Sequence, residues 1–78
     1  MIDEKTKQWL SKMYGIPENE ILWYNSGICY SRIIVETEES ALKVREKVKG
    51  RTANGGWFDG MPLGSYSKTK EGHYDVTC

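Results

Sequence analysis

The side chains that could perform catalysis or bind a metal are few and widely spaced along the chain. His73 is the only histidine, and its available companions are the thiols of Cys29 and Cys78 and the carboxylates of Asp59 and Asp75. Zinc sites and catalytic nucleophiles have recognisable spacings, such as CxxC, HExxH or the nucleophile elbow, and none of these occurs in the sequence. Asp59, which precedes a glycine, is expected to close a turn through its carboxylate. We therefore expect no enzymatic activity and no cofactor.

The stretch from residue 50 to residue 64 combines glycines with large apolar side chains, which is unusual for a surface loop. It contains five of the eight glycines, together with Trp57, Phe58, Met61 and Leu63. One interpretation is that these side chains cover the open side of a thin core. The other is that Trp57 and Phe58 anchor a partner, with Met61 as an adaptable neighbour, because aromatic residues and Met are enriched at interface centres. The sequence leaves both interpretations open, and each can apply to different residues of the loop.

Basic side chains are concentrated just before this stretch. They are Lys43, Arg45, Lys47, Lys49 and Arg51, with Glu46 among them. Residues 1–39 carry four basic and seven acidic side chains, whereas residues 40–78 carry seven and four, so the two halves have charges of −3 and +3. Bases at the end of a helix complement its dipole, which accounts for part of this pattern. We also expect a basic patch that steers the protein towards an acidic or nucleic-acid-facing surface.

Length and composition place the chain among small globular domains. Its 78 residues and 9.0 kDa predict a single domain over residues 1–78, because a second core could not close at this size. Eleven basic and eleven acidic side chains balance, which argues against a strongly basic nucleic-acid-binding domain. The sequence has no apolar run of membrane-spanning length and no signal-peptide pattern, so we expect a cytoplasmic protein with reduced cysteines and no membrane partner. A homodimer would bury some of the nine aromatic side chains that a thin core leaves uncovered.

The first predicted element is a helix between Asp3 and Gly15. Asp3 is a suitable N-cap, and Gly15 followed by Ile16 and a proline is typical of a helix end at which Ile16 folds back onto Leu10. The residues at helical spacing are Thr6, Trp9, Leu10 and Met13. These four are expected to form its inner face.

The rest of the chain predicts two hairpins and a second helix. Strands are expected over residues 21–24 and 28–35, joined by a turn, and over residues 65–69 and 73–78. The second helix is expected over residues 41–50, with Thr37 or Ser40 as its N-cap. The fold class is therefore α+β, a small antiparallel sheet of two hairpins with two helices packed mainly on one face, in the order α-β-β-α-β-β.

A small domain with an aromatic loop, a basic patch and no catalytic set resembles the accessory proteins that bacteriophages use to block host machinery, including anti-CRISPR proteins. The resemblance rests on Trp57, Phe58, Met61 and the basic residues from Lys43 to Arg51. It implies a non-enzymatic protein-interaction module that acts in the cytoplasm of the host cell. Its partner would be a bacterial defence or nucleic-acid-processing protein with an apolar pocket for the loop.

Two other functions fit the same residues. The first is a nucleic-acid-binding domain that uses the basic residues from Lys43 to Arg51, with an affinity that falls steeply as salt rises. Aromatic side chains on predicted strands, such as Trp23 and Tyr74, could stack on bases in such a domain. The second is a protein that sequesters a nucleotide-like molecule between two protomers, held by glycine N–H groups and Trp57 or Tyr66.

Overall fold

The computed structural model describes residues 2–27 and 29–78, so Met1 and Ile28, the first residue of the predicted second strand, lie outside the described residues. The elements in chain order are α1 (Glu4–Tyr14), the 3₁₀ turn η1 (Glu18–Glu20), β1 (Ile21–Ser26), β2 (Ser31–Val35), α2 (Glu38–Val48), the 3₁₀ turn η2 (Gly56–Phe58), β3 (Tyr66–Lys68) and β4 (Tyr74–Thr77). The α+β class and the order of helices and strands predicted from the sequence are confirmed.

Helix α1 begins and ends where its capping residues require. The Asp3 carboxylate accepts a hydrogen bond from the Thr6 backbone N–H at 2.7 Å, and this interaction with Thr6 lowers the pKa of Asp3. At the other end Gly15 has a φ of 68°, and the Ile16 N–H donates to the Ser11 carbonyl at 3.2 Å, as in a Schellman motif. Ile16 and Leu10 are both buried in the core.

The inner face of α1 differs from the one that the sequence predicts. Leu10 and Tyr14 are buried, whereas Trp9 and Met13 are 52% and 38% exposed. Leu10 and Tyr14 are four positions apart, and so are Trp9 and Met13, so each pair lies along its own line on the helix surface. The line that contains Tyr14 faces the core. The indole of Trp9 packs instead edge to face on the Tyr24 ring of β1, with centroids 6.1 Å apart.

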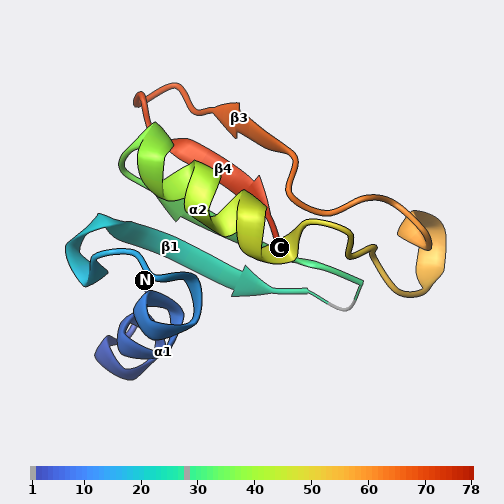
Figure 1. The fold of residues 1–78 in the computed structure, drawn as a ribbon, viewed down its shortest axis with the longest axis horizontal. Helices are drawn as coiled ribbons and strands as arrows, with labels where there is room; N and C mark the ends of the chain where they lie inside the picture. The colour runs from blue at the N-terminus through green and yellow to red at the C-terminus, as the bar shows by residue number, and fades with distance from the viewer. Residues whose placement is uncertain (1, 28) are drawn as a thin grey trace.

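The sheet joins the two hairpins through their inner strands. Its order is β1-β2-β4-β3, and all neighbouring strands are antiparallel. Figure 1 shows α2 lying over β4 and α1 beside β1, while the chain between α2 and β3 extends away from both helices. Two hairpins with helices packed mainly on one face are therefore confirmed.

The core lies between the helices and one face of the sheet. Its buried residues are Leu10, Tyr14, Ile16, Ile21, Ile33, Val35, Ala41, Val44, Val48 and Val76. Each fully buried Leu, Ile or Val stabilises the fold by about 1.5–3 kcal/mol. Alternation along β2 sends Ile33 and Val35 into this core, so Arg32 and Ile34 point to the other face. That second face, here called the open face, also bears Trp23 and Asp75, which pair with Ile34 in the register.

The first turn of α2 is hydrogen-bonded to the carboxylate of Glu20, the residue just before β1. Thr37 is the N-cap, as predicted, and its hydroxyl accepts from the Ser40 backbone N–H at 3.3 Å. Ser40, the other predicted cap, is buried inside the first turn, where its hydroxyl donates to Glu20. The Thr37 hydroxyl donates to the same Glu20 oxygen at 2.5 Å. The hydrogen bonds from Ser40 and then Thr37 lower the pKa of Glu20.

The Glu20→Gln variant tests these hydrogen bonds through the pH dependence of its stability. Because the pKa of Glu20 is lower in the folded state, the charged carboxylate stabilises the fold above its unfolded pKa of about 4.3, and this contribution is lost as pH falls through the folded pKa. We expect the variant to lose about 1 kcal/mol at pH 7, seen as a melting temperature about 4–8 °C lower. The deficit should shrink below about pH 4. A deficit that is the same at pH 7 and pH 3, or one shared by the exposed neighbour variant Glu18→Gln, would contradict this assignment.

Candidate functional site

The glycine-rich loop, residues 51–64, has a hydrogen-bonded base. The Ala53 N–H donates to the Met61 carbonyl at 2.8 Å, and the Gly60 N–H returns a bond to the Ala53 carbonyl at 3.0 Å. The Leu63 N–H donates to the Arg51 carbonyl at 3.0 Å, and Thr52 and Pro62 form an isolated antiparallel bridge between these bonds. Ala53 is 2% exposed, so the loop is held by backbone bonds around a buried residue.

The tip of the loop is the 3₁₀ turn η2. The Asp59 carboxylate accepts from the Gly55 N–H at 2.9 Å, which confirms that Asp59 closes a turn. The Met61 N–H donates to the Phe58 carbonyl at 2.9 Å. Gly55 and Gly56 have φ values of 92° and 61°, a conformation that favours glycine because it has no Cβ. The tip projects beyond the end of the sheet in Figure 1, where it is drawn in orange.

The loop also rests on the connection between β1 and β2. The Asn54 N–H donates to the Cys29 carbonyl at 3.2 Å. The Phe58 ring packs edge to face on the Tyr30 ring, with centroids 5.3 Å apart and planes at 81°. A Cβ on Gly56 would lie 3.0 Å from the Cys29 sulfur, so the two segments are in close contact there. No signal in the sequence indicated this contact, because the two segments are more than twenty residues apart in the chain.

The apolar side chains of the loop divide between the two roles that the sequence left open. Leu63 packs against the core and Met61 is half-buried. Phe58 is 45% exposed, and Trp57 is 100% exposed. A fully exposed indole makes no packing contribution to the fold, although it is the largest apolar side chain of the loop. Trp57 is therefore the loop residue with the most surface to offer a ligand or partner.

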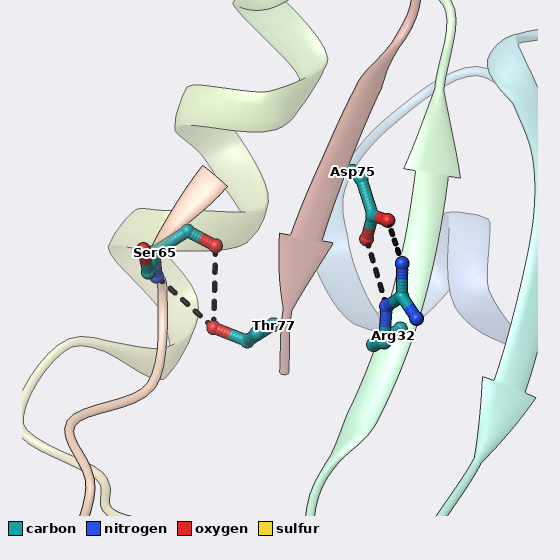
Figure 2. A network of polar contacts seen from close by, with 4 residues as sticks. All are labelled: Arg32, Ser65, Asp75 and Thr77. Carbon is teal, nitrogen blue, oxygen red and sulfur yellow. Dashed lines mark hydrogen bonds and ion pairs between the residues drawn. The ribbon is translucent and has the colours of Figure 1, made fainter. Parts of the chain in front are cut away.

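The open face beside the loop bears a bidentate ion pair. Arg32 of β2 donates through its guanidinium to both carboxylate oxygens of Asp75 on β4, with Nε and Oδ1 3.3 Å apart (Figure 2). The pair raises the pKa of Arg32, chiefly through the hydrogen bonds to Asp75. The guanidinium carbon also lies 5.8 Å from the centroid of the Trp23 ring. These contacts fix the Arg32 side chain across the strands and neutralise its charge.

A hollow of about 310 Å³ lies between the open face and the loop tip. The side chains that line it are those of Trp23, Asn25, Cys29, Tyr30, Arg32 and Phe58. We call it the aromatic hollow, because three of these six side chains are aromatic. Phe58 was predicted from the sequence as a binding residue, whereas nothing in the sequence indicated that Trp23 and Tyr30 lie beside it.

The basic residues predicted to form one patch are divided by the geometry of α2. Lys43 and Lys47 lie on one flank of the helix, and Arg45 and Lys49 lie on the other, because the core residues Val44 and Val48 separate them. The Lys43 ammonium lies 4.0 Å from the Glu39 carboxylate. The guanidinium carbon of Arg45 lies 5.9 Å from the centroid of the Tyr66 ring. Arg45 and Lys49 both line a surface hollow that Leu63 of the loop also lines. Arg51 is the exposed first residue of the loop, so these three bases adjoin the loop.

Most aromatic side chains on the strands are unavailable for stacking on bases. Tyr24, Tyr66 and Tyr74 pack against the core, and the rings of Tyr66 and Tyr74 meet edge to face at 6.1 Å. Trp23 is the exception on β1, because it faces the open side. The arrangement therefore offers one strand aromatic, rather than a row of them, to a nucleic acid.

The groups considered for metal binding or nucleophilic chemistry stay apart. Within residues 2–27 and 29–78, no group of three His, Cys, Asp or Glu side chains is arranged to hold a metal ion. Cys29 and Cys78 are both half-buried free thiols, and burial raises the pKa of Cys78. The Asp75 carboxylate forms an ion pair with Arg32, and the Asp59 carboxylate accepts a hydrogen bond from the Gly55 N–H.

Comparisons with known proteins identify no relative. No protein-family model, curated protein or solved structure matches this chain. Across the part of the chain that the structure describes, no helix is long and apolar enough to span a membrane. Function is therefore inferred from the geometry of the loop and the open face.

Proposed function

We propose that the chain is a non-enzymatic protein-interaction module and that Trp57 is its main anchor. The observation that supports this is the combination of a fully exposed indole and a loop held by its own backbone hydrogen bonds. Tryptophan is among the residues that contribute most to binding energy at interfaces. A loop that is ordered before binding loses less conformational entropy when it binds, so more of the contact energy remains as affinity.

The narrower proposal is an inhibitor of a bacterial defence or nucleic-acid-processing protein, of the anti-CRISPR-like kind that bacteriophages produce. In this proposal Trp57 enters an apolar pocket of the target in the host cytoplasm, with Phe58 and Met61 beside it. The bases that adjoin the loop, Arg45, Lys49 and Arg51, favour an acidic target surface and increase the rate of association. Lys43 and Lys47 lie on the opposite flank of α2 and contribute only to the overall electrostatic field of the protein.

The experiment is a quantitative affinity capture from bacterial lysate with four tagged proteins side by side. They are the wild type, Trp57→Ala, Phe58→Ala and the control Leu42→Ala, which truncates a 44% exposed apolar side chain on α2. We expect one protein to be retained by the wild type and by Leu42→Ala, and to be lost with Trp57→Ala. Equal retention by all four proteins would contradict the proposal.

The same capture separates the two other functions. A nucleic-acid-binding domain would retain nuclease-sensitive material, would release it steeply with salt, and would depend on Lys43, Lys47 and Lys49. A nucleotide-sequestering protein would retain a small molecule detectable by native mass spectrometry and would melt at a higher temperature with that molecule bound. Either kind of retained material, in place of a protein whose capture depends on Trp57, would replace the proposed function.

A further inference from the structure

The aromatic hollow is adjacent to the proposed anchor. Phe58 forms one wall of the hollow and directly follows Trp57 in the turn η2. The other walls come from β1, β2 and their connection, so the hollow is built by the fold and does not depend on the Trp57 side chain. The proposed anchor and one wall of the hollow are therefore consecutive residues of the same turn.

The walls of the hollow favour an uncharged, ring-shaped occupant. Tyr30 and Phe58 already meet edge to face, and Trp23 presents its ring beside the Arg32 guanidinium. Aromatic rings gain most when they meet at offset or edge-to-face geometry, which these walls offer to an entering ring. Among the described residues that line it, Arg32 is the only charged side chain, and Asp75 balances its charge. The hollow therefore has no net charge with which to attract an ion.

We propose that the aromatic hollow receives an aromatic side chain of the partner protein, so that the two proteins exchange anchors at adjacent points. This inference rests on the proposed function, because it names the chemistry of the same partner. A volume of about 310 Å³ is near the lower end for sites that enclose a small molecule, whereas one aromatic side chain needs less room. The exposed Asn25 amide at the rim provides a donor and an acceptor for the backbone that presents this side chain.

The test is an NMR titration of the ¹⁵N-labelled full chain with two uncharged probes, N-acetyl-phenylalaninamide and N-acetyl-leucinamide. The three tryptophans give three indole N–H signals, and Trp9 on α1 serves as an internal control. We expect the phenylalanine probe to shift the Trp23 indole signal and the backbone signals of Tyr30 and Arg32, and to leave Trp9 unchanged. Its affinity should exceed that of the leucine probe by about threefold to tenfold, the range of a favourable aromatic pair.

Two variants locate the probe. Phe58→Ala removes one wall without altering the sheet, and we expect it to weaken binding of the phenylalanine probe at least about threefold. Trp57→Ala is the matched control, because Trp57 does not line the hollow, and it should bind the probe like the wild type. Equal binding of the two probes, no shift at Trp23, or an unchanged affinity in Phe58→Ala would each overturn the inference.

Two further outcomes assign the hollow to other occupants and would also overturn the inference. A Trp23 signal that shifts with protein concentration in the absence of probe, and stops doing so in Trp57→Ala, would assign the hollow to Trp57 of a second copy. A small molecule that co-purifies and is displaced by the probe would assign it to a ligand. Failure of the proposed function is distinguished from these outcomes because it is measured by the dependence of capture on Trp57.

Discussion

The Trp57→Ala variant is expected to melt at the wild-type temperature and to bind the captured partner at least about 30-fold more weakly. Because the Trp57 side chain is 100% exposed, its removal takes away no contact within the protein. A central anchor contributes about 2 kcal/mol or more, which corresponds to this loss of affinity. Thermal denaturation of the free variant and titration calorimetry with the purified partner measure the two quantities separately.

Two controls make this prediction specific to the loop. Leu42→Ala and Trp9→Ala truncate other exposed apolar side chains on α2 and α1, and both should bind with wild-type affinity. A Trp57→Ala variant that binds as tightly as the wild type would contradict the anchoring role of Trp57. A melting temperature several degrees below the wild type would also contradict it, because Trp57 would then be part of the fold.

The second large effect is a contrast between two adjacent residues of β2. Ile33 is fully buried in the core, whereas Ile34 lies on the open face and is half-buried. Ile33→Ala should lower the free energy of unfolding by about 2–5 kcal/mol, because it leaves a cavity among rigid neighbours. That is a large share of the total stability of a domain of this size, about 4–12 kcal/mol. Ile34→Ala should cost about 1 kcal/mol or less.

Urea denaturation of the two variants measures this contrast. Similar losses in both would mean that both faces of the sheet are covered, which would contradict an open face beside the aromatic hollow. The variants also serve the binding experiments, since Ile34→Ala keeps the fold while altering the surface around Trp23.

The features that the sequence predicted correctly depend on contacts between residues close in the chain. The ends of helix α1 are set by the hydrogen bond from the Thr6 N–H to Asp3 and by the left-handed conformation of Gly15, and both features are local. The two hairpins follow from alternation and turns, and the Asp59 turn is closed between two residues only four positions apart. In each case the chemistry that determines the structure is contained within one short segment.

The features that the sequence did not predict depend on contacts between distant residues. Arg32 and Asp75 are 43 residues apart and meet because β2 and β4 are neighbours in the sheet. Phe58 meets Tyr30 because the loop folds onto the hairpin connection. The inner face of α1 was predicted wrongly at Trp9 and Met13, since two equivalent stripes existed and only the packing of Tyr14 selects one. The exposure of Trp57 likewise depended on where the loop folds.

The most direct test of the account is site-specific photo-crosslinking in bacterial cells, with p-benzoylphenylalanine placed at position 57 and, as the control, at position 42. We expect position 57 to form a covalent adduct with one protein, and position 42 to form none with it. Excess wild-type chain should prevent the adduct, and excess Trp57→Ala should not. An adduct with nucleic acid, the same protein adducts at both positions, or no adduct at position 57 would contradict a protein partner anchored by Trp57.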